Sequence, residues 1–158
     1  MIKESPVILV AENIPEELKE LNQWVSWRYE GRDDKLTKVP YTPQGRRASS
    51  TDPTTWSAFS EALGASQDHD GIGFVFSEDD PYAGIDLDEC RDPYTGNVER
   101  RAAETLKRVG PDAYTEISPS GFGIHIIVRA SVRGGGMRRG NIEMYSRGRF
   151  FTITGRVL

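Results

Sequence analysis

Two aspartates, Asp86 and Asp88, lie one residue apart in the stretch AGIDLDEC (83–90). The apolar residues around them predict a strand, and side chains two residues apart in a strand point to the same face. Carboxylates this close repel each other and resist burial unless a cation lies between them. Because Mg²⁺ and Mn²⁺ prefer oxygen ligands, the pair is a candidate metal site. The same pattern is common at turns, and the pair alone does not separate the two readings.

A calcium-binding EF-hand loop that begins at Asp86 is excluded. The position in that loop that requires Gly holds Arg91, and the position that requires the closing Glu holds Asn97.

The segment SPSGFGIHI (118–126) combines small residues with a histidine. Its glycines let the backbone approach a ligand closely, and His125 follows on a predicted strand. The backbone around Gly121, the Ser120 hydroxyl and His125 together have the donors needed to hold a chain of phosphates. The alternative is a β-turn followed by a half-buried histidine.

One more acid lies in the segment IEMYSRGRFFTITG (142–155). Side chains alternate along the strand predicted at its start, so Glu143 adds a carboxylate to an otherwise apolar strand. It is the natural third ligand for a metal ion held by the two aspartates. A solvent-facing strand residue is the alternative.

Charge is distributed unevenly along this chain of net charge −4. Residues 68–92 contain nine acids and one base, whereas residues 129–149 contain six arginines and one acid. An acidic centre suits a metal ion, and an arginine-rich region attracts phosphate. Solvated loops would also explain either cluster by itself. The candidate contacts to nucleic acid are Arg129, Arg138, Arg139 and Arg147.

The composition is that of an ordinary globular protein, with 37% hydrophobic and 28% charged residues, so residues 1–158 are expected to form one domain. No run of about 18 apolar residues is present to span a membrane. The single cysteine, Cys90, excludes an internal disulfide and a cysteine-based zinc site. We expect a cytoplasmic protein.

The hydrophobic pattern predicts an α+β domain with a central, mixed and largely antiparallel sheet and about three helices. Helices are expected at 15–23, 54–65 and 97–110. Strands are expected at 24–30, 37–43, 71–77, 82–88, 114–118, 123–129, 141–147 and 149–157. The two strands at 71–77 and 82–88 are separated by the acidic turn EDDP, which favours a hairpin, and 131–140 is expected to be a mobile loop.

Taken in order, GIDLD, SPSGFGIH and IEMY with SRGRFFTITG resemble the three catalytic motifs of the archaeo-eukaryotic primase superfamily. The upstream block WVSWRYE…TKVPYTPQGRRASSTDPTTWSAF resembles the start of the primase-polymerase domains of phage and plasmid replication proteins. The resemblance runs from about Asn22 to Gly155. It implies a primase-like, RRM-like catalytic core that transfers a nucleotide from an NTP or dNTP to a 3′-hydroxyl on a single-stranded DNA template.

The resemblance also implies roles for individual residues. Catalytic Mg²⁺ or Mn²⁺ would be bound by Asp86, Asp88 and Glu143, although many relatives have Asp where this chain has Glu143. Ser120, Gly121, His125 and Arg149 would contact the triphosphate, and Lys38 and Ser50 would line the path of the nucleotide or template. The family often adds a zinc-binding insert, which one cysteine cannot build, or a helicase or accessory domain, which would follow Leu158. The gene would belong to a phage, plasmid or prophage.

A different class of function is a non-catalytic module that binds single-stranded nucleic acid, with Tyr and Phe side chains stacking on bases. This alternative leaves Asp86 and Asp88 unexplained. A relaxase would need a cluster of histidines, yet His69 and His125 are far apart in the sequence.

Overall fold

Two antiparallel β-sheets form the centre of the computed structural model, which describes residues 7–158. Sheet A contains, in spatial order, β2 (Lys35–Tyr41), β1 (Trp24–Arg32), β3 (Gly71–Val75) and β9 (Phe150–Ile153). Sheet B contains β5 (Tyr114–Ile117), β6 (Ile124–Arg129), β4 (Tyr82–Leu87), β8 (Ile142–Tyr145) and β7 (Gly136–Arg139). The predicted α+β class with largely antiparallel pairing is confirmed, and the strands divide between two sheets.

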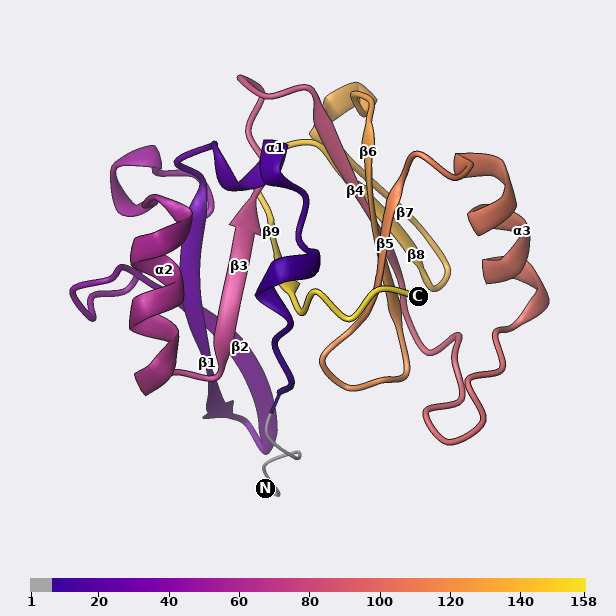
Figure 1. Ribbon diagram of the computed structural model, residues 1–158, viewed down its shortest axis with the longest axis horizontal. Helices are drawn as coiled ribbons and strands as arrows, with labels where there is room; N and C mark the ends of the chain where they lie inside the picture. Colours follow the sequence, from indigo (N-terminus) through magenta and orange to yellow (C-terminus); the bar gives the residue numbers. More distant parts are fainter. Residues whose placement is uncertain (1–6) are drawn as a thin grey trace.

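The two longer helices lie on the outside of the sheets. α2 (Phe59–Ala65) lies beside sheet A and α3 (Arg100–Val109) beside sheet B, so that both sheets are between them (Figure 1). The shorter helices are α1 (Glu16–Lys19), η1 (Ala11–Asn13), η2 (Pro53–Thr55), η3 (Ser66–Asp68) and η4 (Arg133–Gly135). Over residues 7–158, no helix combines the length and apolar character that a membrane crossing requires.

Aromatic side chains fill the space between the two sheets. Phe151 of β9 and Phe76, which follows β3, meet edge to face with their ring centroids 4.9 Å apart. Gly84 of β4 lies against both rings, and a Cβ atom there would come within 2.4 Å of each. Phe74 and Ile127 belong to the same buried cluster. The missing side chain at Gly84 therefore allows the two sheets to approach at this point.

The other face of sheet B packs against α3. Ile85 and Leu87 of β4 form a buried cluster with Ala102 of α3 and with two isoleucines of β6. Because side chains alternate along a strand, Gly84 and Asp86 face the opposite way, toward sheet A. The alternation of β4 thus places a carboxylate between the sheets.

The prediction that 71–77 and 82–88 form a hairpin is wrong. β3 pairs with β1 and β9, whereas β4 pairs with β6 and β8. In the turn between them, the Asp80 carboxylate accepts hydrogen bonds from the backbone N–H groups of Ser77 and Tyr82, at 2.9 and 2.6 Å. This turn leads the chain from one sheet to the other. A short acidic turn is compatible with a hairpin and with a connection between two sheets. Pairing with strands distant in the sequence decides which of the two forms.

The three α-helices are also shorter than the ranges 15–23, 54–65 and 97–110 predicted for them. Ser57 forms a β-bridge with Trp24, so α2 begins only after this extended segment. Val98 likewise bridges Arg91 and delays the start of α3. The first bridge joins positions far apart in the sequence, and the second joins the two ends of a loop. A local helix pattern in the sequence does not indicate such bridges.

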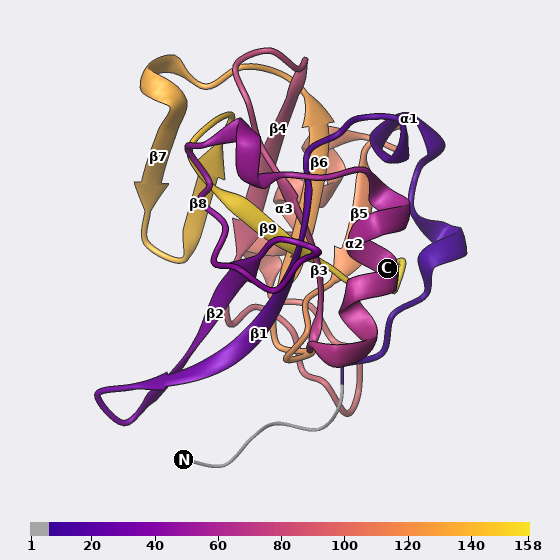
Figure 2. The ribbon, with the colours of Figure 1, turned by 90° about the vertical axis from the view of Figure 1, so that its left-hand side faces the viewer.

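The segment 131–140, predicted to be a loop, contains the strand β7. β7 pairs with β8 from Gly136 opposite Tyr145 to Arg139 opposite Ile142. Figure 2 shows this hairpin projecting at one edge of the molecule. The hairpin brings two arginines, Arg138 and Arg139, onto a defined strand.

Gly84 provides a test of the approach of the two sheets. Gly84→Ala is expected to lower the free energy of unfolding by about 1–3 kcal/mol, because the new methyl group overlaps two buried rings. Gly64→Ala in α2 is the matched control, since nothing lies within 4 Å of its added Cβ. That variant is expected to gain about 0.5–1 kcal/mol from helix propensity. Urea unfolding measures the free energy of unfolding of both variants. Equal values for Gly84→Ala and Gly64→Ala would contradict the close approach of the two sheets at Gly84.

Candidate active site

A row of charged and polar side chains crosses sheet B from one edge strand to the other. Direct cross-strand neighbours run from Glu116 of β5 to His125 of β6, Asp86 of β4, Glu143 of β8 and Arg138 of β7. Residues directly opposite each other in antiparallel strands have side chains on the same face. The row therefore lies on the face of sheet B that is turned toward sheet A, and it joins three of the predicted catalytic residues.

Asp86 lies at the middle of the row and is partly buried. Its Oδ1 atom is 3.7 Å from Nε2 of His125. Burial raises the pKa of Asp86 above its ordinary value, the charges of Asp88 and Glu143 raise it further, and His125 and Lys38 act in the opposite direction. Asp88 and Glu143 are thus both close enough to repel Asp86, and Lys38 lies near Asp86.

Asp88 lies beyond the end of β4, which stops at Leu87, and it is exposed. Its backbone N–H donates to the carbonyl of Asn141 at 3.0 Å. The strand is therefore one residue shorter than the predicted range 82–88, although this hydrogen bond continues the pairing of β4 with β8 to Asp88. Across residues 7–158, no group of three or more His, Cys, Asp or Glu side chains is arranged to hold a metal ion.

Glu143 has a cationic partner on the neighbouring strand. Its Oε1 atom is 3.3 Å from Nε of Arg138, the next residue of the row. Both side chains line the same cavity. The pairing balances the charge of Glu143 on the side away from Asp86.

A cavity of about 780 Å³ adjoins the Glu143 end of the row. Its size is within the usual range for small-molecule sites. Five predicted residues line it, namely Ser50, Arg138, Glu143, Arg147 and Arg149. Trp56 and Tyr145, which the sequence did not single out, line it as well.

Contacts within the wall of the cavity hold its basic side chains in place. The guanidinium of Arg149 lies 4.9 Å from the ring centre of Tyr145, a cation–π distance. Arg147 pairs with Glu78 at 3.3 Å, and the Ser50 hydroxyl donates to the Gly148 carbonyl at 3.0 Å. Two arginines of the turn before β9 and the Ser50 hydroxyl of the loop after β2 thus line the same cavity.

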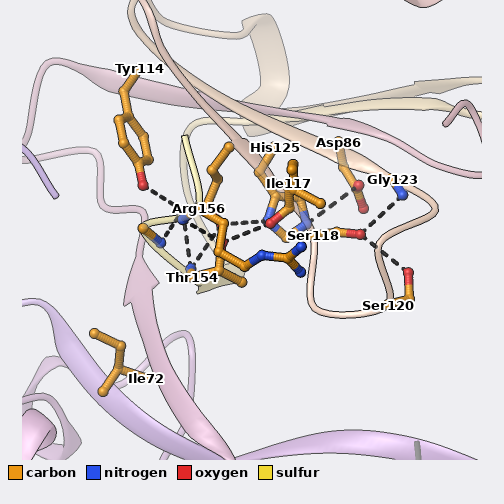
Figure 3. A network of polar contacts seen from close by, with 12 residues as sticks. Ile72, Asp86, Tyr114, Ile117, Ser118, Ser120, Gly123, His125, Thr154 and Arg156 are labelled. Atoms are coloured by element: carbon orange, nitrogen blue, oxygen red, sulfur yellow. Dashed lines mark hydrogen bonds and ion pairs between the residues drawn. The ribbon is translucent and has the colours of Figure 1, made fainter. Parts of the chain in front are cut away.

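The loop between β5 and β6 packs against the end of β4. The Ser118 hydroxyl accepts the N–H of Gly123 at 3.0 Å and is 3.2 Å from the Ser120 hydroxyl. A Cβ atom at Gly123 would lie 2.9 Å from the Leu87 carbonyl, so a residue without a side chain fits there. Figure 3 shows this loop with Asp86 and His125. Ser120 and Gly121 therefore lie on a loop fixed beside the row and outside the cavity lining.

Two predicted arginines do not reach the cavity. Arg129 lies at the far end of β6, where it pairs with Glu17 at 3.5 Å and lies over the ring of Tyr82 at 5.2 Å. Arg139 is exposed on β7 next to Arg138. The structure thus places Arg129 apart from the other candidate phosphate contacts.

Glu116 is a member of the row that the sequence interpretation missed. It is fully buried, and its carboxylate accepts hydrogen bonds from the backbone N–H groups of Thr154 and Gly155 and from the Tyr114 hydroxyl. Its Oε2 atom is 3.3 Å from Nδ1 of His125. The signal was available: a hairpin closed by the turn at 118–123 pairs Glu116 with His125.

Asp86 provides a stability test with a defined sign. Because the pKa of Asp86 is raised above its ordinary value of 3.8, the folded protein holds this proton more tightly than the unfolded chain does. The contribution of Asp86 to stability is therefore full below that value and is lost as the pH rises through the raised pKa. Without metal, Asp86→Asn is expected to be more stable than the wild type at pH 7, and the difference is expected to shrink toward pH 4. Thermal unfolding in EDTA measures this difference in stability. A variant that is less stable than the wild type at pH 7 would contradict the expectation that ionised Asp86 destabilises the fold.

Comparison with known proteins places this arrangement in context. No protein-family model matches the chain. The chain is 37% identical over 166 aligned residues to a protein named DNA Primase-polymerase from Nitratiruptor phage NrS-1. The match covers 99% of this chain and 21% of the phage protein, so the chain spans about a fifth of that relative's length. The chain is therefore related, over nearly its whole length, to one part of a phage DNA primase-polymerase, which confirms the resemblance to primase-polymerase domains that its motifs indicated.

Proposed function

We propose that this domain catalyses template-directed nucleotidyl transfer. A 3′-hydroxyl would attack the α-phosphorus of an NTP or dNTP, and pyrophosphate would leave. The observation that carries the proposal is the row across sheet B, which sets Asp86, Glu143 and His125 side by side at the edge of an arginine-lined cavity. The similarity to a phage DNA primase-polymerase supports it.

Asp86, Asp88 and Glu143 would hold the divalent metal ions, Mg²⁺ or Mn²⁺. The residues fit this role electrostatically, because burial and then the charges of Asp88 and Glu143 raise the pKa of Asp86, and a cation among the carboxylates would offset both effects. Bound divalent ions of this kind lower the pKa of an attacking hydroxyl and neutralise charge on leaving phosphates. The role of the protein is then to position the carboxylates, which need not transfer protons themselves.

Arg149 would bind the triphosphate from the cavity wall beside Glu143, where the Tyr145 ring holds it in place. Arg147 reaches the cavity from the same turn and would contact the template strand. Fixed guanidinium groups bind phosphate oxygens through paired hydrogen bonds. Ser50 at the cavity wall, Lys38 near Asp86, and Ser120 and Gly121 in the loop beside β4 would complete the path of the nucleotide.

His125 would contribute a donor next to the metal ligands in the form that carries a proton on each ring nitrogen, because Nδ1 already faces the Glu116 carboxylate. Its Nε2 atom lies on the side of Asp86, and its side chain is only 7% exposed. A donor held in so little water binds phosphate more strongly than an exposed one. The single-stranded template would lie along the β7–β8 hairpin, where Arg138 and Arg139 are exposed.

Nucleotide incorporation tests the proposed reaction. Asp86→Asn is expected to lower metal-dependent incorporation on single-stranded templates, primed or unprimed, by at least about 100-fold, since several kcal/mol of charge stabilisation is lost. Glu104→Gln on the outer side of α3, whose side chain is 63% exposed, is the control and is expected to keep full activity.

Product on the unprimed template would identify a primase, and product on the primed template alone a polymerase. If the wild type binds DNA but neither incorporates nucleotide nor binds a metal–triphosphate complex in calorimetry, the proposal fails and a non-catalytic binding module replaces it.

The binding of single-stranded DNA tests the arginines separately from catalysis. Removing Arg138 and Arg147 by substitution with Ala is expected to weaken binding and to reduce the slope of log affinity against log salt by about 0.7 for each lost phosphate contact. Arg129→Ala is the matched comparison, because Arg129 is paired with Glu17 away from the cavity. Fluorescence anisotropy across a salt series in EDTA measures the slopes. A larger loss for Arg129→Ala would contradict the assignment of the phosphate path to the cavity.

A further inference from the structure

Within residues 7–158, the polar groups that contact the buried carboxylate of Glu116 are all able to donate hydrogen bonds. Oε1 accepts from the Tyr114 hydroxyl at 2.7 Å and from the N–H groups of Thr154 and Gly155 at 3.1 and 3.2 Å. Oε2 accepts the N–H of Thr154 at 3.0 Å and lies 3.3 Å from Nδ1 of His125. Figure 3 shows Tyr114, Thr154 and His125 in one network of polar contacts. A carboxylate, which only accepts, satisfies all of these partners.

This arrangement selects one form of the His125 ring. A carboxylate has no proton to donate, so the Nδ1 atom that faces it must carry the hydrogen of the contact. Nε2 is then the nitrogen on the opposite side of the ring, 3.7 Å from Asp86 Oδ1. The two carboxylates, one on each side, define which nitrogen faces the candidate active site.

Packing removes most of the remaining freedom of the ring. The His125 ring lies on Phe151 with a centroid distance of 5.1 Å and an interplanar angle of 31°. The plane of the ring is therefore held, and the principal alternative is a flip that exchanges nitrogen and carbon positions. A flip would lose the contact with Glu116, so Glu116 opposes it.

We propose that Glu116 is a positioning residue of the active site, which accepts the Nδ1–H of His125 and thereby directs Nε2 to Asp86 and the bound triphosphate. The part that concerns the triphosphate rests on the proposed function. The part that concerns the His125 ring rests on the contacts of Glu116 alone. Outer partners that orient a ligand-contacting histidine typically affect affinity or activity 10–100-fold when they are replaced.

Nuclear magnetic resonance of the histidine ring nitrogens tests the orientation directly. The chain has only two histidines, and Nδ1 of His69 contacts the Ser26 hydroxyl at 2.7 Å, which provides an internal reference. In the wild type we expect Nδ1 of His125 to carry a proton. In Glu116→Gln, the amide oxygen is expected to accept the backbone N–H groups of Thr154 and Gly155, as the carboxylate does. The amide nitrogen then faces His125 and donates to Nδ1. The proton of Nδ1 is then expected to be lost in this variant, while the His69 signals stay unchanged.

Kinetics test the consequence for the proposed reaction. Glu116→Gln is expected to lower kcat/KM for the nucleotide by about 10–100-fold, mainly through KM. In a His125→Ala background the same substitution is expected to have little further effect, because Glu116 acts through His125.

A structural control separates positioning from stability. Thr154→Val removes a hydroxyl that donates to the Ile117 carbonyl at 2.7 Å and accepts the N–H of Arg156 at 3.1 Å. The backbone N–H of Thr154 that binds Glu116 remains. This variant is expected to lower the unfolding midpoint at the same junction while the state of the His125 ring stays that of the wild type.

The inference is overturned if Glu116→Gln leaves the protonation of Nδ1 unchanged, or if Thr154→Val alters the His125 ring as much as Glu116→Gln does. Additive losses of kcat/KM in the His125→Ala background would also overturn it. Should the wild type incorporate no nucleotide, the proposed function fails, and the ring measurement still decides whether Glu116 orients His125.

Discussion

The fully buried carboxylate of Glu116 joins the end of sheet A to sheet B, and the geometry of the candidate site depends on this junction. A buried charge is costly unless every lone pair finds a donor, and here the chain after β9, Tyr114 and His125 provide the donors. Gly155 is required at this point, because its φ is +69° and a Cβ atom would overlap the Val10 backbone. The same junction therefore closes the fold and orients the histidine.

The alternation of β4 reconciles a packed core with a charged site. Ile85 and Leu87 pack under α3, while Gly84 and Asp86 face sheet A. Because Gly84 has no side chain, the rings of Phe76 and Phe151 pack against it. The apolar core therefore extends to the position next to Asp86 on this face of β4. Burial next to this core raises the pKa of Asp86, because the ionised carboxylate is costly to bury. A metal ion bound at this position would offset that cost.

Opposite charges that lie in separate parts of the sequence meet through strand pairing. The acids of 68–92 and the arginines of 129–149 come together because β8 pairs with β4 on one side and with β7 on the other. Arg138 accordingly neighbours Glu143, and Arg147 and Arg149 enter the cavity from the turn that follows. Arg129 belongs to the same basic stretch but leaves the site, since it lies four residues beyond His125 along β6.

The sequence by itself determined the α+β class, most strand positions and the residue types of the row, because alternation and isolated acids in apolar strands are local patterns. Its motifs also determined the relationship to primase-polymerase domains. Only the tertiary structure decided that β3 and β4 enter different sheets, that 136–139 forms a strand, and which arginines share a cavity with Glu143. These outcomes depend on pairing and packing between distant segments, whose free energies no local pattern contains. Glu116 lies between the two cases: its hairpin partner follows from the turn, whereas its burial follows from the chain after β9.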